Sequence, residues 1–224
     1  MKIALIGATG FVGTAVLEEL IGRGHAVTAL SRHPGPLSPR PLLSVQALDV
    51  YDLDAVARAV QGHDAVVSAF NPGWSAPELY TLYMKGSSAI VRGVEKAAVM
   101  RLLVVGGAGS LFVAPGVQLV DTPAFTDHVP PNIVPGAKAA RDALTALREN
   151  VTLAWTFLSP AAFLAPGERT GNYRLGGDQL LMVGDRPAGI SVADLAVAIV
   201  DELERPRHVR ARFTVASVDA PGPA

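Results

Sequence analysis

The chain has 224 residues, half of them hydrophobic, and a net charge of −1 from 19 basic and 20 acidic side chains. This balanced charge offers no basic surface to a nucleic-acid backbone, so we expect no nucleic-acid partner. The absence of cysteine excludes disulfides, thiolate metal sites and cysteine nucleophiles, and five scattered histidines lack metal-ligand spacing, so we expect no metal.

Two long uncharged stretches, 102–120 and 151–167, have the hydropathy of membrane spans. Glycine and proline interrupt both of them, which is typical of buried strands followed by loops rather than of spanning helices. We therefore expect no membrane contact. The sequence opens directly on a strand-like segment without a signal-peptide pattern, which predicts a cytoplasmic protein.

Short apolar runs alternate with helical patterns along the chain. The runs predict strands at 2–7, 26–31, 42–48, 64–70, 101–107 and 152–159, and the helical patterns lie at about 11–23, 53–61, 75–98 and 136–149. The runs are apolar on both faces, as in parallel strands covered by helices on both sides. The order predicts an α/β fold of the Rossmann type, with a doubly wound, mostly parallel sheet.

The last quarter of the chain has a different pattern. Pro and Gly clusters predict loops at 34–41, 115–136 and 166–189; a short hairpin is expected in the last, followed by a helix at 191–204 and a strand near 211–216. Asp52 and Ser191 stand at N-cap positions. We expect one domain over 1–224, with a small C-terminal extension and a substrate cleft built mainly from 108–135 and 159–190.

Three glycines, Gly7, Gly10 and Gly13, follow the first strand and open the first helix. In this context glycine permits a tight turn, lets a pyrophosphate reach backbone N–H groups, and lets the helix pack closely on the strand. The alternative is an ordinary turn whose glycines serve packing alone. We expect a dinucleotide-binding loop.

The end of the second strand bears on the choice of coenzyme. It carries Ser31 and Arg32, and no acidic residue occurs between Glu19 and Asp49. An NAD site places an acid on the ribose 2′-OH about 20 residues after the glycine loop, whereas an arginine suits the 2′-phosphate of NADP. The sequence favours NADP(H), with NAD(H) as the alternative coenzyme and a solvated loop arginine as the alternative interpretation of Arg32.

Several motifs together resemble one family. GATGFVG near the start, VVGGAGSL after the fifth strand and LSPAAFLAPGERTGNYRLGGD late in the chain are similar to the atypical short-chain dehydrogenase/reductases. Within them the chain resembles the NAD(P)H-binding group, which includes NmrA-like sensors, flavin and biliverdin reductase-like proteins, and chains named NAD-dependent epimerase/dehydratase. The resemblance extends over nearly the whole chain.

The resemblance implies a set of cofactor contacts. They are Gly7, Thr9, Gly10, Phe11 and Val12 around the pyrophosphate, Ser31 and Arg32 at the adenosine phosphate, Asp49 and Val50 at the adenine, Ala69, Phe70 and Asn71 along the ribose and diphosphate, Gly106 and Gly107 near the nicotinamide, and Pro160 and Ala161 at its carboxamide. Asp49 also fits the role of an acid flanking the next helix, so both interpretations stay open.

One family feature is missing. Members that interconvert alcohols and ketones use a tyrosine activated by a lysine four residues later, and no YxxxK occurs in this sequence. Lys138 is present in the corresponding helix, but Val134 stands four residues before it. Ser110 matches the family's serine and is the candidate catalytic residue, with capping of a loop as its alternative role.

Without the acidic phenol, the site lacks an evident proton donor for carbonyl reduction. Hydride transfer to a flavin or quinone demands less of the protein, because the cofactor carries the reaction. We therefore predict an NAD(P)H-dependent reductase of a small apolar or aromatic acceptor, acting as a monomer or homodimer. The alternatives are a non-catalytic NADP(H) sensor and, last, a sugar-nucleotide epimerase or dehydratase.

Overall fold

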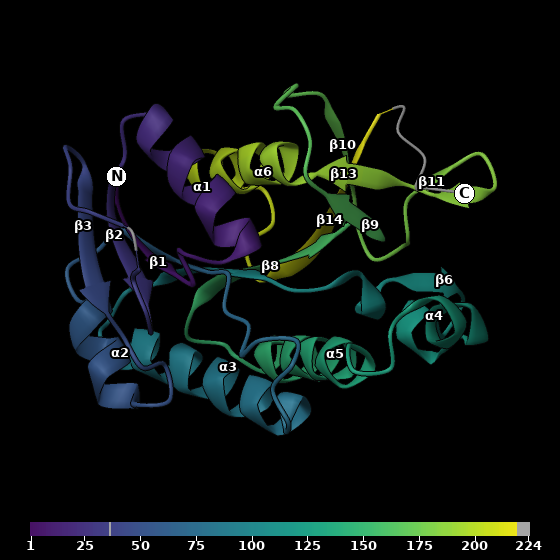
Figure 1. The fold of residues 1–224 in the computed structure, drawn as a ribbon, viewed down its shortest axis with the longest axis horizontal. Helices are drawn as coiled ribbons and strands as arrows, with labels where there is room; N and C mark the ends of the chain where they lie inside the picture. The colour runs from purple at the N-terminus through teal and green to yellow at the C-terminus, as the bar shows by residue number, and fades with distance from the viewer. Residues whose placement is uncertain (36, 219–224) are drawn as a thin grey trace.

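An eight-stranded sheet forms the centre of the computed structural model, which describes residues 1–35 and 37–218 (Figure 1). All neighbouring strands are parallel except the pair at one edge. This arrangement confirms the predicted Rossmann-type, mostly parallel sheet. In spatial order its strands are β3 (Leu43–Ala47), β2 (Ala26–Ser31), β1 (Lys2–Ile6), β4 (Ala65–Ser68), β5 (Arg101–Val105), β8 (Ala154–Pro160), β14 (Ala211–Ser217) and the antiparallel β10 (Tyr173–Gly176).

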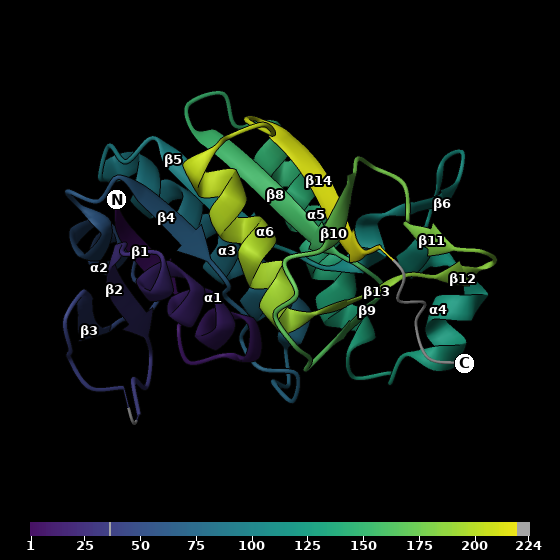
Figure 2. The ribbon, with the colours of Figure 1, turned by 90° about the horizontal axis from the view of Figure 1, so that it is seen from above.

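Helices cover both faces of this sheet. Figure 1 shows α1 (Phe11–Gly22) and α6 (Val192–Glu204) on one face, and α2 (Leu53–Val60), α3 (Leu79–Lys96) and α5 (Val134–Arg148) on the other. In Figure 2, α1 and α6 run side by side. The side chains of Asp52 and Ser191 accept backbone N–H bonds at the starts of α2 and α6, as predicted. No helix in the described residues is long and apolar enough to cross a membrane.

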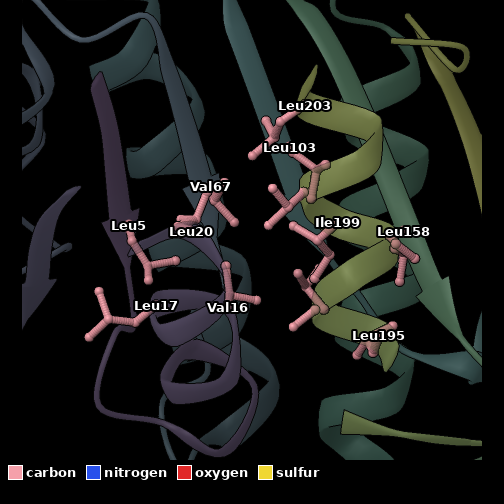
Figure 3. Packing of buried hydrophobic residues seen from close by; sticks show 14 of the residues in the cluster. Leu5, Val16, Leu17, Leu20, Val67, Leu103, Leu158, Leu195, Ile199 and Leu203 are labelled. Atoms are coloured by element: carbon pink, nitrogen blue, oxygen red, sulfur yellow. The ribbon is translucent and has the colours of Figure 1, made fainter. Parts of the chain in front are cut away.

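The core consists of two apolar layers, one on each face of the sheet. Leu5, Val67 and Leu103 from the strands meet Leu20 and Ile199 from α1 and α6 in the first layer (Figure 3). The second layer packs α2, α3 and α5 against the opposite face. Because every central strand is buried on both faces, the sequence shows continuous apolar runs instead of polar alternation.

Two segments predicted to be loops contain more regular structure than expected. Segment 115–136 holds β7 (Val117–Gln118), which pairs with β6 (Phe112–Ala114), then a 3₁₀ turn, the short helix α4 (Pro123–His128) and the first turn of α5. Segment 166–189 holds the edge strand β10 and the predicted hairpin, formed by β11 (Met182–Val183) and β12 (Arg186–Pro187). The strand β13 (Gly189–Ser191) pairs with β9 (Phe163–Ala165). These elements are too short for periodicity to reveal them. Of these, β10 and β13 also depend on partners from other parts of the chain, namely β14 and β9.

Candidate functional site

A cavity of about 920 Å³ lies at the carboxyl ends of the central strands. The sheet order reverses between β1 and β4, since the chain runs from β1 to β2 and β3 on one side and from β4 to β5 and β8 on the other. Loops diverge at such a switch point, and open α/β sheets bind ligands in the resulting crevice. The volume suits a dinucleotide-sized or drug-sized ligand.

The glycine loop forms part of the cavity wall. Gly7 has a φ of +81°, and a side chain there would meet the Ala69 carbonyl oxygen at 2.5 Å. Gly10 is the N-cap of α1 and supplies no capping side chain. The first N–H groups of α1 therefore lie at the cavity without a side-chain cap, and such groups bind anions.

Gly13 lets α1 approach this loop. A Cβ atom at Gly13 would lie 1.9 Å from the Gly7 carbonyl oxygen, which is too close for two non-bonded atoms. The backbone of the loop thus packs directly on the first turn of the helix. Side chains at Gly7 and Gly13 would collide with backbone atoms, so the glycines allow a tight loop, which we call the glycine cradle and which fits the close approach of a pyrophosphate.

The ends of β2 and β3 form the next part of the wall. Ser31 Oγ lies 2.8 Å from Thr9 Oγ1, which joins the end of β2 to the glycine loop. No hydrogen bond or ion pair joins Arg32 to any residue that the structure describes. Asp49 accepts a hydrogen bond from the Tyr51 backbone N–H at 3.0 Å and lines the cavity. Capping of the following helix falls to Asp52 instead.

Every residue predicted to contact the cofactor lines this one cavity, and the loops after six strands supply them. They are Gly7, Thr9, Gly10, Phe11 and Val12 after β1, Ser31 and Arg32 at the end of β2, Asp49 and Val50 after β3, Ala69, Phe70 and Asn71 after β4, Gly106 and Gly107 after β5, and Pro160 and Ala161 at the end of β8. The fold thus brings the predicted set together, while its contact with a cofactor stays a prediction.

Ser110, the candidate catalytic residue, lies outside the cavity lining. Its side chain is buried, and its Oγ atom lies 3.3 Å from Ser159 Oγ and 3.4 Å from Arg212 Nη1. Arg212 is in turn ion-paired with Asp178. Ser110 therefore belongs to a buried polar cluster behind the loop after β5, and its catalytic role stays a prediction.

Beyond Gly106 and Gly107 the cavity continues into a region lined by apolar side chains, which we call the apolar wall and list below. None of these side chains is charged. The charged side chains of the cavity, Arg32 and Asp49, lie at the ends of β2 and β3. Residues 165–190 do not line the cavity; Arg169 and Thr170, for example, bind Glu19 and Asp194 instead. The apolar wall consists of Trp74, Phe125, Val129, Pro130, Ile133, Ala137, Phe163 and Leu164.

Helix α5 faces the cavity with small residues. Gly136, Ala137 and Ala140 line it, whereas Lys138 and Val134 do not. A Cβ atom at Gly136 would meet the Trp74 ring at 3.0 Å, so the indole packs directly on the helix. The face on which a Tyr–Lys pair would stand is therefore apolar here.

Two tyrosines that the sequence analysis did not assign to the site, Tyr51 and Tyr83, line the cavity. Burial raises the pKa of Tyr83 to about 12, because the phenolate is disfavoured away from water. Tyr51 contacts the Phe70 ring edge-on, at 6.1 Å between centroids. Helical spacing with Leu79 places Tyr83 on an inward face of α3, but spacing alone does not indicate that the ring reaches a cavity.

Comparisons with known proteins add an independent line of evidence. A family model described as NAD(P)H-binding matches residues 7–206. Bacillus subtilis YwnB is 41% identical over 220 residues, which cover 97% of this chain and 99% of YwnB.

Solved structures give the same result. A Bacteroides thetaiotaomicron protein provisionally named an epimerase is 45% identical, with a TM-score of 0.90 and 99% of each chain covered. A Streptococcus pneumoniae protein provisionally named an NADH-flavin reductase is 37% identical, with a TM-score of 0.83 and with 97% of this chain and 99% of that chain covered. The chain therefore belongs to the NAD(P)H-binding family, within the atypical short-chain dehydrogenase/reductases that its motifs resemble.

Proposed function

We propose that the protein is an NAD(P)H-dependent reductase that transfers hydride to a small apolar or aromatic acceptor. The observation that carries this proposal is the continuity of the cavity, in which a glycine cradle and the apolar wall share one space of about 920 Å³. When bound, the cofactor supplies the hydride. The protein binds both molecules, orients them and keeps water from the apolar part of the site.

The residues at the adenosine end favour NADP(H). Arg32 lines the cavity without a hydrogen bond or ion pair among the described residues, so its guanidinium is available to a 2′-phosphate. Ser31 stands where an NAD site would place an acid, and Thr9 holds it. NAD(H) is the alternative coenzyme.

The apolar wall favours a planar acceptor. Trp74, Phe125 and Phe163 offer aromatic surfaces, against which a flavin or quinone ring would pack. The uncharged face of α5 supports hydride transfer without a Tyr–Lys pair. The name of the Streptococcus pneumoniae relative agrees with a flavin as one acceptor.

Turnover tests this proposal. Purified protein is incubated with NADPH and a panel of flavins and quinones, and NADPH oxidation is followed by absorbance. We expect oxidation well above the rate without protein, and its loss in Gly10→Asp, where a carboxylate would repel the diphosphate. Gly177→Asp adds the same charge at a position with open space around it and is expected to keep the activity. NADPH binding without acceptor-dependent oxidation would contradict the reductase and support the sensor.

A further inference from the structure

We propose that the Tyr83 hydroxyl donates a hydrogen bond to a carbonyl oxygen of the acceptor, an inference that rests on the proposed function above. Tyr83 stands on α3, is 5% exposed and lines the cavity. Its ring packs against Ala139 and Ala140 of α5, and its centroid lies 6.0 Å from that of Phe70.

The Tyr83 hydroxyl has no partner among the described residues. Buried phenols normally find one, and two of the other tyrosines do, since Tyr80 donates to Asp142 and Tyr173 donates to Asp201. Tyr51 also lines the cavity and lacks a partner, but its oxygen is fully enclosed, whereas the Tyr83 oxygen is not among the fully enclosed unpaired atoms. We therefore infer that the unpaired Tyr83 hydroxyl is available to a ligand in the cavity that this residue lines.

Its neighbours place the Tyr83 side chain near the expected junction of cofactor and acceptor. Ala140, against which the Tyr83 ring packs, lies beside Gly107, because a Cβ atom at Gly107 would be 3.8 Å from that of Ala140. Gly107 ends the loop predicted to lie near the nicotinamide. The small side chains between them leave room for a ligand to meet both the nicotinamide and the phenol.

The chemistry of the surroundings selects the ligand group. The apolar wall supplies neither charge nor hydroxyl, so an acceptor oxygen buried there would lose bonds to water. The Tyr83 hydroxyl is a donor that can replace one of them. A donor of this kind recognises a conjugated carbonyl, as in a quinone or the flavin ring. A hydrocarbon of the same shape would gain nothing from it.

The phenol acts in its neutral form. Burial holds the pKa of Tyr83 at about 12, so the hydroxyl stays a donor throughout the neutral range. As the acceptor gains two electrons and one hydrogen with the hydride, the nicotinamide is oxidised and negative charge gathers on the carbonyl oxygen, which Tyr83 stabilises by hydrogen bonding. That oxygen then takes its proton from water, and Tyr83 keeps its own.

The kinetic test compares Tyr83→Phe with Tyr80→Phe, which removes a hydroxyl that Asp142 binds outside the cavity. With NADPH and menadione, we expect Tyr83→Phe to lower kcat/KM about 10- to 100-fold, because donors to a developing oxyanion have effects of this order or larger. The NADPH Kd should stay within about twofold. Tyr80→Phe should match the wild type, and an unchanged kcat/KM in Tyr83→Phe would overturn the inference.

A binding test separates this inference from the proposed function. Menadione and 2-methylnaphthalene, which lacks both carbonyls, are titrated into the NADP⁺-loaded protein while tryptophan fluorescence is followed, to which Trp74 in the apolar wall contributes. We expect Tyr83→Phe to weaken menadione about fivefold or more, with an unchanged affinity for 2-methylnaphthalene. This result without turnover would refute the reductase and retain the contact. The contact would be refuted if menadione bound the wild type and Tyr83→Phe with equal affinity, or if it did not bind the wild type at all.

Discussion

At the scale of single residues, Arg32 is the side chain from which we predict the choice of coenzyme. It follows β2, lines the cavity, and makes no hydrogen bond or ion pair with the described residues. Because this guanidinium has no ion pair to break, a phosphate can bind it without that energetic cost. Its planar arrangement of N–H groups also matches the oxygens of a phosphate. The proposed preference for NADP(H) therefore rests chiefly on this residue.

Arg32→Glu is expected to raise the NADPH Kd about 10- to 100-fold, because the loss of a charge-assisted hydrogen bond costs roughly 1.5–3 kcal/mol. The NADH Kd should change much less, since NADH lacks the 2′-phosphate. Isothermal titration calorimetry measures both constants. Arg58→Glu reverses the same charge away from the cavity and serves as the control. An NADPH Kd within about twofold of the wild type would refute the assignment.

At the scale of elements, the contact between α1 and the loop after β1 shapes the cofactor cradle. The sequence indicates this contact through its glycine spacing, and the structure gives the reason, since only a hydrogen atom fits between Gly13 and the Gly7 carbonyl. A β-carbon would force the helix away from the strand. Cofactor binding and stability are thus coupled at this contact.

Gly13→Ala is therefore expected to lower the free energy of unfolding by about 1–3 kcal/mol or more, as overpacked sites do, and to weaken NADPH binding. Gly22, the last residue of the same helix, has open space around it. There alanine should be neutral or should stabilise by about 0.5–1 kcal/mol. Urea unfolding of the two variants measures this difference, and equal stabilities would contradict the packing argument.

A second element contact joins α1 to the segment before β10. The Glu19 carboxylate, 8% exposed, accepts hydrogen bonds from Arg169 at 2.7 and 2.9 Å and from Arg23 at 2.7 Å. These bonds, those from Arg169 foremost, hold the pKa of Glu19 below its ordinary 4.5, although burial opposes them. The ionised carboxylate therefore stabilises the folded chain above pH 4.5, and this contribution disappears as the pH falls through the lower folded pKa.

Glu19→Gln is accordingly expected to be about 1–3 kcal/mol less stable than the wild type at pH 7. The gap should narrow as the pH falls below 4.5, because the wild-type carboxyl then becomes neutral as well. Urea titrations at several pH values test this. Glu18→Gln removes an exposed carboxylate paired with Arg40, and its effect should stay below about 1 kcal/mol. A gap for Glu19→Gln that does not change with pH would contradict the account.

At the scale of the whole molecule, the cavity exists because loops from strands far apart in the chain meet at one edge of the sheet. Residues from position 6 to position 164 line it, so no short segment carries the site alone. A ligand that binds these loops together should stabilise the folded chain as a unit.

NADPH at about 100 times its Kd is expected to add about 2.7 kcal/mol to the free energy of unfolding. For a chain of this size this corresponds to an increase in Tm of roughly 5–10 °C. Differential scanning calorimetry measures the shift, with Gly10→Asp as the variant expected to show none. An unchanged wild-type Tm at saturating NADPH would contradict the cofactor site.

Much of this molecule could be predicted from local patterns. The continuous apolar runs predict parallel strands, Asp52 and Ser191 predict helix starts, and the glycine spacing predicts the cradle. The edge strand β10 and the helix α4 lie in segments predicted to be loops. Pairing with β14, far along the chain, stabilises β10, whereas α4 is a six-residue helix capped locally by Thr122. Ser110 matches a family motif, yet its orientation depends on the buried Arg212, which lies about a hundred residues later in the chain.

The sequence by itself determined the fold class and the tight glycine loop between β1 and α1, where we predict that the cofactor binds, because backbone sterics and apolar patterning act between neighbouring residues. Only the tertiary structure decided which polar groups reach the cavity. It places Ser110 in a buried cluster and Tyr83 in the wall of the cavity, since the packing of α3 against α5 and of the β5 loop against β14 positions these side chains. No local pattern contains that information, because the orientation depends on contacts between segments far apart in the chain.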